Sequence, residues 1–502
     1  MAAVYSEYTR DRVGMFFGLT GAQLGILVAA AGPGLWAFHQ QKWAVLGVAT
    51  LLWLVVLVLV AVPVRGRSAT GWLIASTAFA AGTLMRVTRF RSRTAKGRGG
   101  ELAIPDLPGV LHGIRVHDGP PQGPLNTRIA IIQDHAGRVW AATARISHPG
   151  LALVDGTDRD SQGSGLTQLL NACARTGLIS EVAFVVRSPS DDGAERTQWL
   201  ARHDNPEAPP LARKVNGEIA SMLTTASVRT ETFVTIVAPE HRLARRDREF
   251  GRGVDGRARA MQMLMSEVEG YLRTGMRMSE VAWLTSPELA VAVRTGFAPG
   301  DRAGIVEALA AAKDGTAINA DVPWAQAGPA GAEQAVRSYA HDAWHSVSAT
   351  MQLPARGAVL GSLAPVLVPT APGERRSLLV MYPILAEGAA DRQTQTREWS
   401  ADMAESLRAK AGVKTRARDR TDQHRTRGVD AKLASGHALV RPYAVACVTV
   451  PATMAIAEFG GHLDVSIRRA GFAPLRLDMS QDQGFAAANI PLGLGLHDRG
   501  NS

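Results

Sequence analysis

Two histidines, His341 and His345, stand four residues apart in the string "HDAWH", with Asp342 between them. On a helix this spacing could place two imidazole ligands for a metal ion on one face. The residues that follow, "SVSATMQLP", alternate between apolar and polar types as a strand does. We therefore expect the pair to straddle a loop and the start of a strand, and we predict no metal site.

The sequence also lacks the motifs that hold phosphate groups or activate a nucleophile. No GxxxxGK[ST] loop occurs, and the string closest to it, "AGVKT" at 411–415, lacks the glycine–lysine pair. No GxSxG elbow and no HExxH helix is present. The two cysteines, Cys173 and Cys447, lie far apart in apolar segments, which favours buried thiols in a reducing compartment. We expect no catalytic residue, no cofactor and no metal, and so a protein that is not an enzyme.

The positioning elements begin with two long apolar runs. Residues 16–38 carry no charge, and residues 43–64 are rich in Leu and Val, so each run is long enough to cross a bilayer. Only "HQQK" separates them. The sequence therefore predicts a transmembrane hairpin over residues 1–64.

A third uncharged stretch of about eighteen residues lies between the basic ends of residues 65–93. Its core of Ala, Ser, Thr and Gly is weakly apolar, and cations at both ends favour the cytoplasmic side under the positive-inside rule. We expect residues 65–95 to form an interfacial amphipathic basic helix, with the amino terminus and the large body of an inner-membrane protein in the cytoplasm. The residues expected at the lipid surface are Arg65, Arg67, Trp72, Arg86, Arg89, Arg91 and Arg93.

The remaining chain alternates short apolar strands with amphipathic helices. Strand–helix–strand, an excursion, and strand–helix–strand is the order of a ferredoxin-like βαββαβ unit. We predict a first cytoplasmic α+β module over 96–335 and a second, ferredoxin-like module over 336–502 with a helical insertion near 386–435. The expected fold class is thus a membrane-anchored α+β protein, in which a two-helix transmembrane hairpin precedes ferredoxin-like α/β sandwich modules.

The formal net charge is +10, with 55 Lys and Arg against 45 Asp and Glu, which favours acidic partners. Basic residues concentrate in two runs, 241–260 and 410–428. Both contain interleaved acids and lack aromatic platforms, so a solvated helical face or a protein-docking surface is favoured over single-stranded nucleic acid. The residues expected to contact a partner are Arg245, Arg246, Lys414, Arg416, Arg418 and Arg420.

Five stretches, taken in order, resemble an actinobacterial family of membrane proteins associated with conjugation or type IV secretion loci. They are "VGMFFGLTGAQLGIL", "RTETFVTIVAP", "PELAVAVRTGF", "AHDAWHSV" and "DQGFAAANIPLGLGL". The membrane part is similar to the PrgI-type small subunit of those systems. The body is similar to the amino-terminal, non-motor region of their hexameric traffic ATPase.

This resemblance implies a non-enzymatic scaffold subunit that docks a separate ATPase at the cytoplasmic face of an export channel and forms an oligomer within a larger complex. It implies no catalytic residues. Two alternatives stay open: an EccE-like membrane component of type VII secretion, and a membrane-tethered nucleic-acid-binding protein of plasmid transfer.

Overall fold

A computed structural model of the chain describes residues 4–5, 21–61, 69–98, 100–150, 156–203, 205, 207–226, 228–251, 253–352, 358–359, 361–385 and 437–496. Two compact units result. One, the body, comprises residues 1–5, 87–386 and 438–502, and the other comprises residues 6–86 and 387–437. The expected helical insertion near 386–435 lies outside the described residues.

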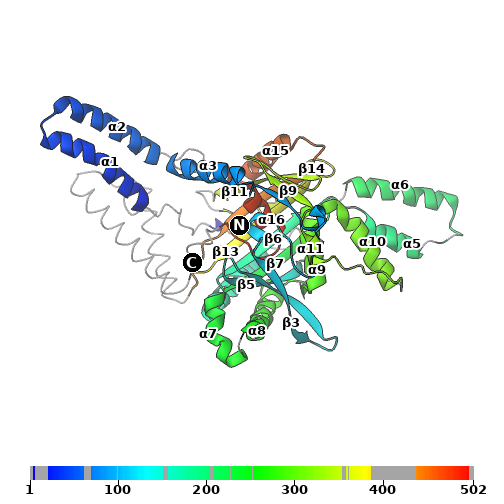
Figure 1. Ribbon diagram of the computed structural model, residues 1–502. Coiled ribbons are helices and arrows are strands. Elements are labelled where there is room, and N and C mark those ends of the chain that lie inside the picture. The colour runs from blue at the N-terminus through cyan, green and yellow to red at the C-terminus, as the bar shows by residue number, and fades with distance from the viewer. Residues whose placement is uncertain are drawn as a thin grey trace. The chain divides into compact units, whose positions relative to one another are not determined.

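In its described residues the smaller unit contains three helices, α1 (Gly21–His39), α2 (Trp43–Ala61) and α3 (Ala69–Leu84) (Figure 1). Helices α1 and α2 contact each other, and the indole Nε1 of Trp53 donates a hydrogen bond to the carbonyl of Leu27 at 3.0 Å. Within the described part of the chain, one helix, Trp43–Val60, is long and apolar enough to cross a membrane by length and composition. A shorter apolar helix spans Gly25–His39.

The expectation of a single basic helix over 65–95 is wrong beyond Leu84. Helix α3 ends there, Arg86 adopts a left-handed backbone with φ 57°, and strand β2 (Arg89–Arg91) follows. The strand forms because Phe90 pairs with Ala332 of β9 (Gly331–Gln334) and packs against the core of the body.

The arginines of this segment therefore have different surroundings from those expected. Arg89 forms an ion pair with Glu333 at 2.8 Å, and Arg93 lies 3.7 Å from the Asp106 carboxylate. Arg86 and Arg91 are exposed, and Trp72 is half-buried in α3. Arg65 and Arg67 lie outside the described residues.

The body is built on one sheet of thirteen described strands, and all its strand pairings are antiparallel. The main path runs β2-β9-β10-β11-β14-β13-β6-β7-β5-β4-β3, with β15 on β11 and β8 on β5. Besides β2 and β9, the strands are β3 (Ile114–Gln122), β4 (Thr127–Asp134), β5 (Val139–Ser147), β6 (Glu181–Ser188), β7 (Glu231–Pro239), β8 (Glu280–Trp283), β10 (Tyr339–His341), β11 (Trp344–Gln352), β13 (Arg375–Pro383), β14 (Tyr443–Pro451) and β15 (Ala473–Arg476). Strands β1 (Val4–Tyr5) and β12 (Ala358–Val359) form a separate pair.

The expected α+β class is confirmed, and helices surround the sheet (Figure 1). They are α4 (Gly156–Thr176), α5 (Ala194–His203), α6 (Pro210–Ala226), α7 (Glu240–Phe250), α8 (Gly253–Thr274), α9 (Ser286–Phe297), α10 (Arg302–Lys313), α11 (Trp324–Ala327), α12 (Ala364–Leu367), α15 (Ile456–Arg469) and α16 (Gln481–Asn489). The described residues also include the short 3-10 turns Thr94–Lys96, Gly109–Leu111 and Pro299–Asp301.

Both faces of the sheet are covered, which explains why its central strands are apolar at nearly every position. In β7, Phe233 and Val237 pack with α9 and α16, whereas Val234 and Ile236 pack with α4 and α8. In β14 the same alternation separates Cys447, on the α9 and α16 side, from residues that pack with α15. Successive side chains of a strand point to opposite faces, so each of these strands contributes to two cores.

The sheet contains the same strand order twice. Strands β8-β5-β7-β6 are neighbours in the first half of the body, and β15-β11-β14-β13 are neighbours in the second half. The two sets join where β6 pairs with β13, for example Val186 opposite Leu378. The residues of the two expected modules therefore share one continuous sheet.

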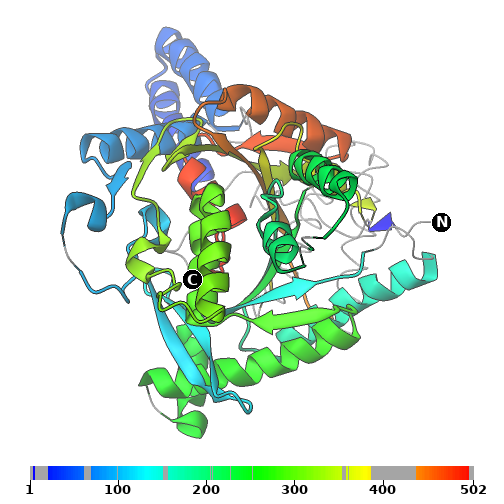
Figure 2. The ribbon, with the colours of Figure 1, turned by 90° about the vertical axis from the view of Figure 1, so that its right-hand side faces the viewer.

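The carboxyl-terminal residues of the described chain cross this sheet. Figure 2 shows α16, in red, near the middle of the body. After it, the carbonyl of Pro491 accepts a hydrogen bond from Thr143 at 2.7 Å. Gly493 has φ 75°, and a Cβ atom there would come within 2.8 Å of Val237. Only glycine allows the backbone to lie this close to β7.

Candidate functional site

Helix α9 brings its carboxyl-terminal turn into the interior of the body. A capping box between Thr285 and Glu288 fixes its start, with the Thr285 amide donating to the Glu288 carboxylate at 2.9 Å. Leu289, Val293 and Phe297 recur every four residues and are fully buried. The last carbonyls of such a buried helix need hydrogen-bond donors from elsewhere in the chain.

Arg375 and His341 supply these donors, and Arg187 adds a donor just before the last turn. Arg187 of β6 donates from Nη1 to the Ala292 carbonyl at 2.8 Å. Arg375 of β13 donates to the carbonyls of Thr295 and Gly296 at 2.8 and 2.7 Å. His341 of β10 donates from Nδ1 to the Phe297 carbonyl at 2.7 Å. Positive charge at a helix carboxyl terminus also stabilises the helix through its macrodipole.

The histidine is held in one tautomer by a chain of hydroxyls. Because a carbonyl can only accept, Nδ1 of His341 carries the proton, and Nε2 accepts from Ser346 at 2.8 Å. Ser346 in turn accepts from Thr449 at 2.7 Å, and Thr449 accepts from Arg375 at 3.2 Å. Burial lowers the pKa of His341 well below its usual range, and the charge of Arg375 acts in the same direction, so the imidazole is neutral. We call Arg187, His341, Ser346, Arg375 and Thr449 the α9 cap cluster.

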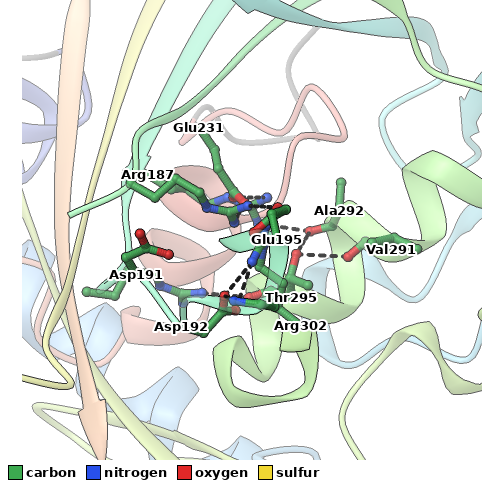
Figure 3. A network of polar contacts seen from close by, with 12 residues as sticks. Arg187, Asp191, Asp192, Glu195, Glu231, Val291, Ala292, Thr295 and Arg302 are labelled. Carbon is green, nitrogen blue, oxygen red and sulfur yellow. Dashed lines mark hydrogen bonds and ion pairs between the residues drawn. The ribbon is translucent and has the colours of Figure 1, made fainter. Parts of the chain in front are cut away.

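A carboxylate balances part of the buried positive charge. Glu231 of β7 forms an ion pair with Arg187 at 2.8 Å (Figure 3). It forms a second ion pair with Arg229. Burial alone would raise the pKa of Glu231, but the charges of Arg187, Arg229 and Arg375 outweigh it, so the pKa is lowered. The Arg187 guanidinium also lies 4.7 Å from the centre of the Phe233 ring. Burial and the neighbouring Arg187 lower the pKa of Arg375.

The paired Ser346 and His341 resemble part of a nucleophile–base arrangement, but their surroundings favour a structural role. In a catalytic triad a carboxylate accepts the hydrogen bond from the second ring nitrogen of the histidine. In His341 a backbone carbonyl takes that place. Both side chains have a relative exposure of 0%, so a substrate could not reach the hydroxyl without opening the core. The cluster instead joins strands from both halves of the sheet to the end of one helix.

A second ionic group lies beside the cluster at the start of α10. Arg302 binds both oxygens of Asp192 at 2.7 and 2.8 Å and also contacts Glu195 (Figure 3). Burial would raise the pKa of Asp192, but its hydrogen bonds with Arg302 lower it overall. Asp191, Asp192 and Glu195 are close enough together to hold a cation, but the guanidinium of Arg302 already meets the charge of two of them.

The residues predicted to contact a partner are placed only in part. Arg245 is exposed on α7, and Arg246 belongs to the same helix. The four predicted residues of the second basic run, Lys414, Arg416, Arg418 and Arg420, lie outside the described residues. The α9 cap cluster contains none of the predicted residues.

The sequence does hold a signal for the cluster. Arginines stand inside or at the edge of otherwise apolar strands, as in "AFVVRS" and "ERRSLLV". A charged residue within a strand covered on both faces needs a buried partner. The "HDAWH" string spans the turn between β10 and β11. His345 stands at the start of a strand, as expected, whereas His341 ends β10 rather than lying in a loop, and it donates to the Phe297 carbonyl.

No protein-family model matches this chain, and a comparison with curated proteins likewise finds no match.

Proposed function

We propose that this protein is a non-enzymatic membrane scaffold of a type IV secretion or conjugation-like export machine, which docks a separate ATPase at the cytoplasmic face. The observation that carries the proposal is the combination of α2, an apolar helix long enough to cross a membrane, with a large body built on one sheet. Such a chain offers an anchor and a rigid surface.

The body suits a rigid scaffold because hydrogen bonds between buried polar groups hold its helices and strands together. The donors of the α9 cap cluster go to helix carbonyls, and Ser377 of β13 donates to Asn489 of α16 at 2.6 Å. Buried hydrogen bonds that join strands to helices favour one packed arrangement over its alternatives. A surface presented by this body would keep its shape when a partner binds.

We propose further that each half of the sheet is a ferredoxin-like module and that α1 and α2 form the membrane hairpin. The repeated strand order supports the first idea, since strands one to four of a βαββαβ unit lie in the order 4-1-3-2. The contact between Trp53 and Leu27 supports the second. Cations after α3, from Arg86 onward, favour a cytoplasmic body under the positive-inside rule.

Purification of the full chain in detergent tests the scaffold proposal. We expect the ATPase encoded by a neighbouring gene to co-purify with the chain from membranes, and we expect no ATP hydrolysis by the chain alone. The control is the same purification from cells that lack the ATPase gene. Hydrolysis that persists through successive columns in that control, at a constant ratio to the protein, would refute a non-enzymatic role. Failure of the ATPase to co-purify would refute the docking role.

A further inference from the structure

Helix α6 presents an apolar stripe to solvent. It lies between β6 and β7 in the chain and projects with α5 and α10 from one side of the body (Figure 1). Leu211, Val215, Ile219 and Met222 follow the i, i+4, i+8, i+11 spacing that places side chains on one face of a helix. Their relative exposures are 71%, 42%, 42% and 70%.

The described part of the body covers little of this helix. From Pro209 to Ile219 every residue is exposed, and Arg196 of α5 reaches only the Ile219 backbone carbonyl, at 3.3 Å. Helix α5 packs instead on α10, where Gln198 donates to the Val306 carbonyl at 3.0 Å. A helix of 17 residues draws most of its stability from a covered apolar face. An exposed stripe of four large side chains therefore indicates a binding surface.

The chemistry of the stripe favours a protein surface over lipid. Helices that lie on membranes carry many Lys and Arg residues on the polar face and aromatic residues on the apolar face. Helix α6 has no aromatic residue, and its charged residues are Arg213, Lys214 and Glu218. Because α6 carries both positive and negative side chains, it suits a partner helix that also carries both.

We infer that α6 pairs in antiparallel fashion with α6 of a second copy of this chain. A two-fold axis between residues 216 and 217 would set Leu211 opposite Met222 of the other copy. Lys214 of one copy and Glu218 of the other copy would then be offset along the helix axis by only one residue, roughly 1.5 Å. Lys214 and Glu218 flank the stripe on the same side, and a two-fold antiparallel pair brings these like flanks together. The charges that flank the stripe are therefore complementary to themselves in an antiparallel pair.

The pairing is expected to be weak in dilute solution. One helical stripe buries less than the roughly 800 Å² per partner that is usual for a stable complex. Two chains held in one membrane meet at a far higher effective concentration, which converts a weak contact into a populated dimer. The inference goes beyond the proposed docking of an ATPase, and its concentration effect rests on the proposed membrane anchoring.

Disulfide cross-linking of the full chain tests the pairing and its direction. Leu211→Cys and Met222→Cys are placed on separate copies with different tags, and these thiols are readily distinguished because Cys173 and Cys447 are buried. On mixing in liposomes and mild oxidation, we expect a cross-link between the two tags. Each variant alone should give at most a tenth of that yield, because its own thiols would lie about 16 Å apart along the axis.

A matched pair of further substitutions checks that the apolar stripe drives the contact. Val215→Glu with Ile219→Glu, in the same cysteine background, should lower the cross-linking yield at least tenfold. Gly217→Glu, on the opposite side of α6 with no atom within 4 Å of its Cβ position, should leave the yield unchanged. Cross-linking of each cysteine variant with itself would indicate a parallel pair and overturn the inference. Absence of any cross-link would overturn it as well. In that case, a fluorescent dye attached to Leu211→Cys shows whether the stripe binds lipid instead.

Discussion

Replacement of Arg375 by methionine should lower the free energy of unfolding of the full chain by about 3 to 5 kcal/mol, the range for removing one partner from a buried ionic network. Arg375 has 2% relative exposure, and its guanidinium binds the carbonyls of Thr295 and Gly296 together with the hydroxyl of Thr449. Methionine fills a similar volume but leaves three buried acceptors without this donor. Urea unfolding of the detergent-purified chain, followed by circular dichroism, measures the change.

Two companion variants separate the role of the network from a general effect of losing an arginine. Arg115→Met removes an exposed arginine from β3 of the same sheet and should change stability by less than about 0.5 kcal/mol. Arg375→Lys should recover only part of the loss, because an ammonium group lacks the planar fork that spans two carbonyls. Equal unfolding midpoints for Arg375→Met and Arg115→Met would contradict the structural role given to the α9 cap cluster.

Two arginines in the middle of α2 should release the protein from membranes. Leu52 and Val55 are exposed on α2, so Leu52→Arg with Val55→Arg would place two charges in the hydrocarbon core. The cost on insertion scales is roughly 5 to 7 kcal/mol for the pair. We expect most of the variant in the soluble fraction after a carbonate wash, whereas the unchanged protein should remain in the pellet.

The matched control for this anchor is Leu52→Met with Val55→Ile, which changes the same positions and keeps them apolar. It should fractionate as the unchanged protein does. If the arginine variant also stays in the carbonate-washed pellet, then α2 does not anchor the chain.

Much of the local structure can be predicted from the sequence because the strands are short apolar runs between polar turns. The apolar runs "EVAFVVRS" and "YAVACVTVP" and the alternating run before Ser147 predict strands, and these residues form β6, β14 and β5. The run at 256–275 predicts a helix, and α8 covers nearly all of it. In each case the periodicity of the residues themselves contains the information.

Long-range pairing could not be predicted in the same way. Nothing local in β6 indicates that Val186 lies opposite Leu378, and this pairing fuses the two halves into one sheet. The basic segment after α3 gives no local sign that it forms a strand. Its Phe90 pairs with Ala332, which lies far along the chain, so the sequence nearby favours a continued helix instead. The α9 cap cluster depends on the same distant contacts, since its members come from five strands.

Site-directed labelling tests the central claim, an anchored protein whose body faces the cytoplasm, most directly. Gln40, in the turn between α1 and α2, and Leu125, in the turn between β3 and β4 with 85% relative exposure, are both open to a reagent. A membrane-impermeant maleimide should label Gln40→Cys in intact cells and Leu125→Cys only after the inner membrane is permeabilised. The buried native thiols keep the background low. Labelling of Leu125→Cys in intact cells would place the body outside and contradict the account.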